Sequence, residues 1–181
     1  GGIVTDRANL AATIRQLRDW GQAGRYNHVR HGFNYRMDGL QGAVLEVKLA
    51  HLPAWTERRR AVAALYDELL AGSGISTPQK PKALEHVYHV YAIRSPERDR
   101  LREALAQAGV ATGMHYPCPV HLQPAYADLG YRSGDFPVSE RLAAELLSLP
   151  IYPELTPEQQ RHICNTLCGS RAEGKVEIHA A

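Results

Sequence analysis

The chain has 181 residues and a formal net charge of +2 at pH 7, with 44% hydrophobic and 22% charged residues. This balance is typical of a soluble globular chain with a sizeable core, and it excludes an intrinsically disordered one. The nearly neutral charge gives no reason to expect nucleic acid as a partner. Apolar runs stay well short of the ~18 residues of a transmembrane helix, so no membrane partner is expected.

The first part of the chain is predicted to contain a strand end, a helix and a polar loop. Residues 1–5 are apolar and are interpreted as the end of a buried strand. Asp6 is a suitable N-cap for a helix that Gly21 ends, and residues 21–33 form the loop. The spacing predicts that one face of this helix carries Leu10, Ile14 and Leu17.

A second helical pattern follows this loop. Asp38 and Gln41, three residues apart, predict a capping box at its start. The first apolar stripe consists of Leu40, Val44, Val47 and Leu52. Pro53 is expected to begin or kink the next segment, because proline lacks the amide that continues a helix. The helical period then continues to about Ala71, where Gly72 ends it.

The remaining chain changes character after a loop at 73–85 and is predicted to be an α+β unit. The run 86–93 alternates β-branched and aromatic residues, as a half-buried strand does. Residues 169–181 are expected to be a frayed tail. The other predicted elements are a helix at 97–108, a strand at 110–115, a helix at 138–147 and a helix that Thr156 and Pro157 open and that runs to about Leu167.

The three cysteines are an odd number, so they cannot form a fully paired disulfide framework. Cys164 and Cys168 are one helical turn apart with His162 nearby, which raises the question of a metal site. A second ligand pair at a standard spacing is missing from the sequence, so we expect no metal and reduced, packed thiols. Reduced thiols suit an intracellular, cytoplasmic location.

One candidate site is the stretch that enters the second predicted helix. Asn34 and Arg36 lie just before that helix, where side-chain donors and the helix dipole favour an anion. The alternative is that both side chains only satisfy the loop backbone and solvent. The run of Arg58, Arg59 and Arg60, further along the chain, is interpreted as a solvated helix face.

A second candidate site is the loop 115–126, which follows the strand predicted at 110–115. Three prolines within eight residues stiffen it, and it carries two histidines and two tyrosines, His115 and Tyr116 among them. A rigid loop with donors and aromatic faces is suited to line a ligand site. The alternative is a structural loop packed on its own aromatic rings.

Several stretches in this order resemble the DegT/DnrJ/EryC1/StrS family of sugar aminotransferases. They are Gly-Gly-Ile-Val-Thr-Asp at 1–6, Gly-Phe-Asn-Tyr-Arg-Met-Asp-Gly-Leu-Gln-Gly-Ala at 32–43, Val-Tyr-His-Val-Tyr at 87–91, His-Tyr-Pro at 115–117, Gln-Pro-Ala-Tyr at 123–126, Asp-Phe-Pro-Val-Ser-Glu at 135–140 and Leu-Ser-Leu-Pro-Ile-Tyr-Pro-Glu-Leu-Thr at 147–156. The resemblance extends over residues 1 to about 167. It implies a pyridoxal 5'-phosphate (PLP) enzyme of α/β fold type I, the aspartate aminotransferase-like fold.

The resemblance also implies an organisation and a reaction. Family members move an amino group, usually from glutamate, onto a ketosugar bound to a nucleotide, in aminosugar or polysaccharide synthesis. They form homodimers with the cofactor near the interface. The implied parts are the end of the large PLP-binding domain at 1–52, a connecting helix and linker at 53–85, the small domain at 86–168 and a tail at 169–181.

The resemblance assigns roles to the two candidate sites. Asn34 would reach the cofactor phosphate of the partner subunit, and Arg36 would support that loop or approach the substrate. His115 and Tyr116 would lie on the small-domain side of the substrate cleft. The sequence therefore leads us to expect cofactor-binding residues and substrate-binding residues, and no metal site.

The resemblance places the catalytic Schiff-base lysine shortly before the Gly-Gly-Ile-Val-Thr stretch, so it would precede Gly1. The four lysines of the chain, Lys48, Lys80, Lys82 and Lys175, lie in other contexts. We therefore expect no catalytic residue within this chain and no activity from it alone. Two alternatives stay open: a sugar dehydratase of the same family, with histidine at the lysine position, and a non-catalytic binding or regulatory paralogue.

Overall fold

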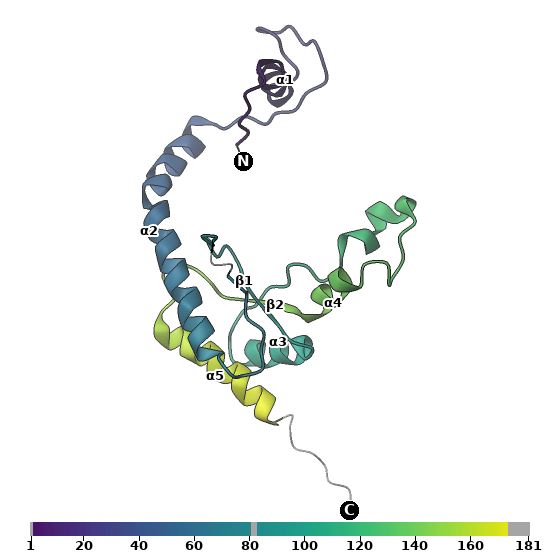
Figure 1. Cartoon of the computed structure of the whole chain (residues 1–181). Helices are drawn as coiled ribbons and strands as arrows, with labels where there is room; N and C mark the ends of the chain where they lie inside the picture. The colour runs from purple at the N-terminus through teal and green to yellow at the C-terminus, as the bar shows by residue number, and fades with distance from the viewer. Residues whose placement is uncertain (1, 81–82, 174–181) are drawn as a thin grey trace, which may run out of the picture. The chain divides into compact units, whose positions relative to one another are not determined.

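The computed structural model describes residues 2–80 and 83–173, so the expected tail is covered only up to residue 173. The chain divides into two compact units, Gly1–His51 and Leu52–Ala181. They are described separately below, and Figure 1 labels their elements.

The first unit contains α1 (Ala8–Arg18), a long loop and the start of α2. The strand expected at 1–5 is wrong, because the described residues 2–5 adopt no strand, and Ile3 and Val4 are 71% and 97% exposed. A strand requires a neighbour with which to pair, and the described part of this unit offers none there. The predicted N-cap is also wrong, because Arg7 occupies the N-cap position in place of Asp6.

Helix α2 (Gly39–Leu69) is a single helix of 31 residues. The predicted capping box is confirmed: the Gln41 amide donates to Asp38 Oδ1 at 2.7 Å, and the Asp38 amide donates to Gln41 Oε1 at 3.1 Å. Pro53 lies inside this helix and begins no new one. Proline removes one backbone donor from the ladder, and the helix continues past it to Leu69.

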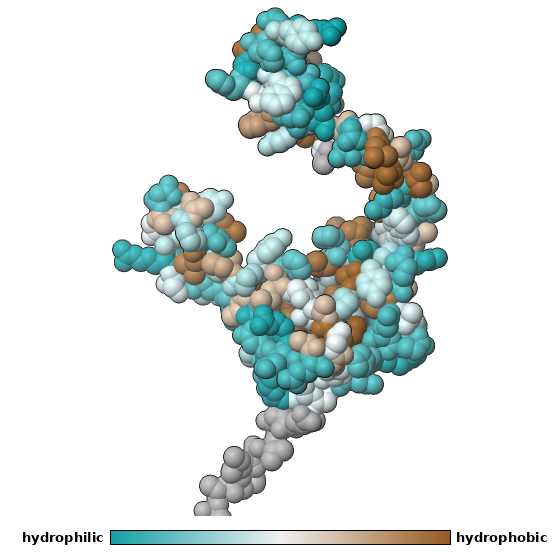
Figure 2. Space-filling view, turned by 180° about the vertical axis from the view of Figure 1, so that it is seen from behind, coloured by the Kyte–Doolittle hydropathy of each residue, from teal (hydrophilic) through white to brown (hydrophobic). Residues whose placement is uncertain are grey.

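The N-terminal half of α2 exposes many apolar side chains, which gather there in Figure 2. Its C-terminal half instead buries Val62, Ala63 and Tyr66 in the core of the second unit. An exposed apolar surface of this extent is uncommon on a free helix, and it indicates a contact surface. The exposed residues are Leu40, Val44, Leu45, Val47, Leu49 and Leu52.

In the described part of the second unit, an antiparallel strand pair is covered by helices. β1 (Tyr91–Arg94) pairs with β2 (Leu146–Leu149), with Tyr91 opposite Leu149 and Arg94 opposite Leu146. The core lies between this pair and α2, α3 and α5, and the buried members include Leu101, Leu105, Ile163 and Leu167. The other elements are α3 (Arg98–Gln107), the 3-10 helices η1 (Val120–Leu122) and η2 (Pro124–Leu129), α4 (Pro137–Glu145) and α5 (Pro157–Glu173).

The strand predictions for this unit need correction. The strand expected at 86–93 begins only at Tyr91, because Tyr88 has a left-handed φ of 49°. The strand expected at 110–115 is reduced to an isolated bridge between Gly113 and Ser148. The helix expected to end at Leu147 ends at Glu145, and β2 starts directly after it.

The last helix begins as predicted and ends later than predicted. The Gln159 amide donates to Thr156 Oγ1 at 3.3 Å, and the Thr156 amide donates to Gln159 Oε1 at 2.9 Å. Helix α5 then continues to Glu173, so the expected tail from residue 169 is helical for five residues. The rest of that tail lies outside the described residues.

The interpretation of the arginine run as a solvated face is wrong for two of its members. Arg59 Nη1 donates to the carbonyl oxygens of Ile151 and Tyr88, at 2.8 and 3.2 Å. Arg60 Nε donates to the His86 carbonyl at 2.9 Å, and its Nη2 lies 3.1 Å from Glu85 Oε2. These bonds fasten two segments to α2: the loop before β1 and the segment that follows β2.

The cysteines are free thiols, and Cys164 is 2% exposed within the core. Burial raises the pKa of the Cys164 thiol to about 12. His162 Nε2 lies 3.1 Å from the Ala108 carbonyl oxygen. Across residues 2–80 and 83–173, the structure has no group of three or more potential metal ligands. None of the helices described in this chain is long and apolar enough to cross a membrane.

Candidate functional site

Asn34 is held by a loop that folds back onto the end of α1. The Phe33 amide donates to the Leu17 carbonyl at 2.6 Å, and the Tyr35 amide donates to the Arg18 carbonyl at 2.8 Å. The Trp20 amide donates to the Phe33 carbonyl at 3.0 Å. Backbone bonds on both sides of Asn34 therefore fix its position.

Two glycines make this loop possible. A Cβ on Gly21 would lie 1.7 Å from the Arg30 carbonyl oxygen, and Gly21 has a φ of +75°. A Cβ on Gly32 would lie 2.1 Å from the Gly21 nitrogen. Because both neighbours are backbone atoms, only glycine permits the backbone at Gly21 and the backbone at 30–32 to approach this closely.

The Asn34 side chain is oriented by an arginine. Arg36 Nε donates to Asn34 Oδ1 at 3.0 Å, and Arg36 Nη1 lies 3.3 Å from Asp19 Oδ1. Asp19 Oδ1 is shielded from solvent and accepts no hydrogen bond among the described residues. The nearby Arg36 guanidinium therefore balances its charge. Since Oδ1 of Asn34 is used as the acceptor, its Nδ2 amide remains as a donor for a ligand.

Sequence reasoning identified Asn34 and Arg36 and missed Asp19. A signal was present, because a carboxylate at the C-terminal end of a helix opposes the helix dipole. Asp19 is the C-cap of α1, and its pairing with Arg36 balances that unfavourable position. The structure thus brings the two predicted residues together and adds a third.

His115 is anchored to the strand pair of the second unit. Its Nδ1 lies 2.8 Å from Ser148 Oγ, and Ser148 is buried on β2. Gly113 and Ser148 exchange two backbone bonds of 2.8 and 3.0 Å. A Cβ on Gly113 would lie 2.7 Å from His115 Cε1, so the absence of a side chain there makes room for the ring. Tyr116 is 72% exposed and packs edge-on against His115, with ring centroids 5.4 Å apart.

Beside these two residues lies a cavity of about 590 Å³ within the second unit. That volume is within the range of small-molecule sites. The cavity is lined largely by aromatic and aliphatic side chains, and among the described residues that line it none is Lys, Arg, Asp or Glu. Besides His115 and Tyr116, the lining includes Cys118, His121, Tyr126, Tyr131, Phe136 and Ser139.

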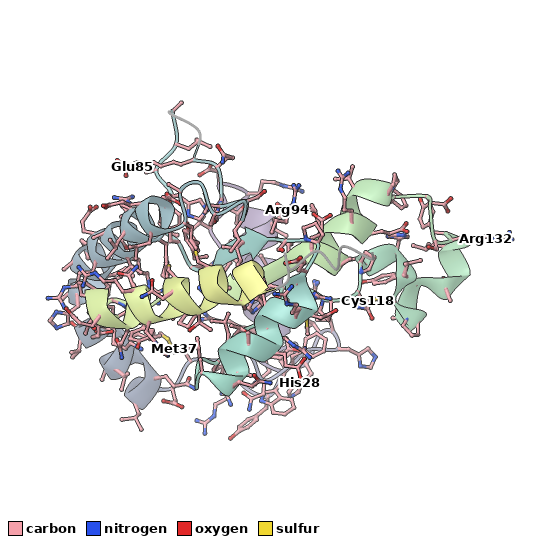
Figure 3. The ribbon with its side chains drawn as sticks, turned by 90° about the horizontal axis from the view of Figure 1, so that it is seen from below. His28, Met37, Glu85, Arg94, Cys118 and Arg132 are labelled. Carbon is pink, nitrogen blue, oxygen red and sulfur yellow. The ribbon has the colours of Figure 1, made fainter. Side chains whose placement is uncertain are left out.

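The cavity is built on the arm formed by residues 118–145, which projects from the core of the unit (Figure 1). Figure 3 shows Cys118 at the inner end of this arm and Arg132 at its outer end. His121 and Glu140 form a polar contact inside the arm, with Nε2 and Oε1 3.0 Å apart. Sequence reasoning placed His121 on the candidate loop 115–126 but gave Glu140 no role. Glu140 is the last residue of the stretch 135–140, one of those that resemble the family.

Asn34 and Arg36 belong to the first unit, and His115 and Tyr116 belong to the second. The structure brings the members of each pair together. The first pair offers an oriented amide donor, and the second pair borders an aromatic cavity with a fixed imidazole.

Comparison with solved structures defines the class of protein. The fold is that of PLP-dependent sugar aminotransferases of fold type I. The structure of DesV from Streptomyces venezuelae matches with a TM-score of 0.86 and 39% identity, over 96% of this chain and 47% of that one. A DegT DnrJ EryC1 StrS aminotransferase from Brucella abortus matches with a TM-score of 0.82 and 36% identity, over 91% and 44%.

A sequence model of the DegT/DnrJ/EryC1/StrS aminotransferase family matches residues 1–168, and the chain belongs to this family. It is 41% identical, over 92% of its length, to a dTDP-3-amino-3,4,6-trideoxy-alpha-D-glucose transaminase of Streptomyces venezuelae. It is 47% identical, again over 92%, to the erythromycin biosynthesis sensory transduction protein EryC1 of Saccharopolyspora erythraea. A pleiotropic regulatory protein of Geobacillus stearothermophilus is 45% identical over 90% of the chain. The chain spans 44–46% of the length of these relatives.

Proposed function

We propose that this chain forms the C-terminal portion of a PLP-dependent aminotransferase that moves an amino group from glutamate to a nucleotide-linked ketosugar. The observation that carries the proposal is the side chain of Asn34, which Arg36 orients with its amide donor available. Relatives named as transaminases of dTDP- and UDP-linked sugars support the substrate class.

The residues of the first unit fit the phosphate of PLP. The Nδ2 group of Asn34 can donate to a phosphate oxygen, and a hydrogen bond to a charged acceptor is stronger than a neutral one. Arg36 acts by orienting Asn34, and its own charge is paired with Asp19. When bound, PLP supplies the electron sink that amino-group transfer requires. We further propose that Asn34 serves the cofactor of a partner subunit in a homodimer; the exposed apolar surface of α2 supports such an interface.

The cavity of the second unit suits an uncharged ring of the nucleotide-linked sugar, because its described lining is largely aromatic and aliphatic. The exposed ring of Tyr116 offers a flat apolar face, against which a sugar or base ring can pack. His115 uses Nδ1 toward Ser148, so Nε2 is the nitrogen that can bond a substrate hydroxyl. Neither residue needs to exchange a proton for these roles.

In this proposal residues 1–52 end the large domain, 53–85 connect it, and 86–168 form the small domain. The separation of the two units between His51 and Leu52 supports the first boundary. Lys48 lies in α2 and Lys80 is exposed in a loop, whereas Lys82 and Lys175 lie outside the described residues. None has the sequence context of the family's Schiff-base lysine, so the 181 residues alone are expected to be inactive.

The test is isotope transfer by the complete protein that contains this chain. The protein is supplied with PLP, a nucleotide-linked ketosugar and glutamate carrying a labelled amino nitrogen. We expect the label in the sugar product, detected by mass spectrometry, and no transfer by the 181-residue chain. Cofactor binding without transfer to any dTDP- or UDP-linked ketosugar would contradict an aminotransferase.

The names of two relatives favour a second candidate, a regulatory protein that binds the cofactor or the sugar nucleotide without turnover. The same experiment separates the two. A regulator would bind the nucleotide sugar and leave the labelled nitrogen on glutamate.

A further inference from the structure

Glu140 contacts several polar groups next to the cavity of the second unit. Its carboxylate accepts hydrogen bonds from the Gly134 amide at 2.9 and 3.0 Å, and from the Phe136 amide at 3.3 Å. Ser133 Oγ donates at 3.1 Å, and His121 Nε2 lies 3.0 Å from Oε1. A carboxylate offers about four acceptor positions, so these contacts use its capacity fully.

The groups that Glu140 holds carry aromatic rings of the cavity. The side chain of His121 is 9% exposed, and its ring lies 4.7 Å from the ring of Phe136. Phe136 in turn contacts Tyr131 edge-on at 5.1 Å. These three rings, His121, Tyr131 and Phe136, are here called the aromatic wall. All three line the cavity, whereas Glu140 itself does not.

The turn that carries this wall lies on the surface, where residues 131–139 are exposed, and it leads into α4 at Pro137. Apart from the bonds to Glu140, the Asp135 amide donates to the Arg132 carbonyl at 3.2 Å and the Arg132 amide donates to Asp135 Oδ2 at 2.8 Å. The Gly134 amide, followed by His121 and the other donors, lowers the pKa of Glu140. Glu140 is therefore ionised at neutral pH, in the form that accepts from all of its donors.

We infer that Glu140 is a positioning residue that fixes the aromatic wall against which the uncharged sugar ring of the substrate packs. The inference rests on the proposed function and deepens it. Glu140 does not touch substrate; it orients His121 through Oε1 and Phe136 through the turn at 133–136. Substrate binding, more than the chemical step, therefore depends on Glu140.

The test uses Glu140→Gln in the complete protein. Glutamine keeps the size of the side chain, but its single carbonyl oxygen cannot accept from all of these donors. We expect KM for the nucleotide-linked ketosugar to rise about tenfold while kcat changes less than about twofold, the signature of lost binding common to ground and transition states. KM for glutamate and the absorbance of the bound cofactor should stay unchanged. Phe136→Leu, which removes a ring of the wall, should give the same division between KM and kcat.

The matched control is Glu145→Gln on the same helix. Glu145 Oε2 pairs with Arg94 Nε at 3.0 Å, and Glu145 lies outside the cavity lining. This variant also loses a partly buried carboxylate, and we expect it to leave KM for the ketosugar unchanged. An equal rise of KM in both variants would overturn the inference, because general loosening of α4 would then explain it.

A readout without turnover separates this inference from the proposed function. If the wild-type protein transfers no amino group, the proposed function fails, and hydrogen exchange of the Gly134 amide still tests the positioning role. We expect this amide to exchange at least about tenfold faster in Glu140→Gln and unchanged in Glu145→Gln, because opening of the turn then costs less free energy. Unchanged exchange in Glu140→Gln would overturn the inference, and so would faster exchange with unaltered KM in an active enzyme.

Discussion

The loop that carries Asn34 depends on two glycines, so small substitutions there should affect cofactor binding from a distance. Gly21→Ala adds a methyl group that would lie 1.7 Å from the Arg30 carbonyl oxygen, at a φ of +75°. A left-handed alanine costs about 1–2 kcal/mol, and forced overpacking adds about 1–3 kcal/mol. The total of roughly 2–5 kcal/mol is as large as what a few loop hydrogen bonds contribute, at about 1 kcal/mol each, so the substitution can disrupt the loop.

Gly24 provides the matched control in the same loop. It has a φ of +88°, and a Cβ there would meet no atom within 4 Å among the described residues. Gly24→Ala should therefore cost only the backbone strain of about 1–2 kcal/mol. Gly32→Ala isolates the other contribution, because its Cβ would lie 2.1 Å from the Gly21 nitrogen without a left-handed φ.

The assay is a PLP titration of the complete protein, followed by absorbance. Gly21→Ala and Gly32→Ala should weaken cofactor binding at least about tenfold, equivalent to about 1.4 kcal/mol, because the loop can no longer present Asn34. Gly24→Ala should bind PLP within about twofold of wild type. Equal cofactor affinity in Gly21→Ala and Gly24→Ala would refute the proposed role of the close approach.

Three further predictions concern the second unit. Leu105→Ala removes a fully buried side chain and should lower the free energy of unfolding by about 2–5 kcal/mol in urea denaturation; a loss below about 1 kcal/mol would contradict its place in the core. The raised pKa of Cys164, about 12, keeps its thiol protonated near neutral pH, so Cys118 should react with an alkylating reagent well before Cys164, as mass spectrometry of the peptides would show. The folded pKa of Glu140 is lowered from 4.5, so its stabilising effect is fully present above pH 4.5 and is lost as pH falls below that value through the folded pKa. The difference in melting temperature between wild type and Glu140→Gln should accordingly be constant at neutral pH and shrink below pH 4.5; a difference that does not depend on pH would contradict this.

The features that local chemistry determines could be predicted from the sequence. The capping box of Asp38 and Gln41 involves residues three apart and formed as expected. Thr156 capped the last helix for the same reason. Cys164 packed as a small apolar residue, because its burial follows from the helical period.

The features that failed depend on distant partners. Alternation at 86–93 predicted a strand, but pairing with β2 begins only at Tyr91. Tyr88 has a left-handed φ, and its carbonyl accepts from Arg59 of α2 instead of from a strand. β2 itself was hidden because its apolar residues continue the pattern of α4. The pairings of Asp19 with Arg36 and of Glu140 with His121 join segments that only the folded chain brings together, so neither pairing could be read from spacing.

The central claim is that Asn34 donates to the phosphate of PLP, and a pair of variants of the complete protein tests it most directly. Asn27 lies in the same loop, and its Nδ2 donates to the Ala23 carbonyl at 3.2 Å, so Asn27→Ala is the control for loop stability. A hydrogen bond to a charged group contributes about 1.5–3 kcal/mol, so Asn34→Ala should weaken PLP binding by roughly 10- to 100-fold, with Asn27→Ala close to wild type. Equal PLP dissociation constants for Asn34→Ala and wild type would contradict the claim.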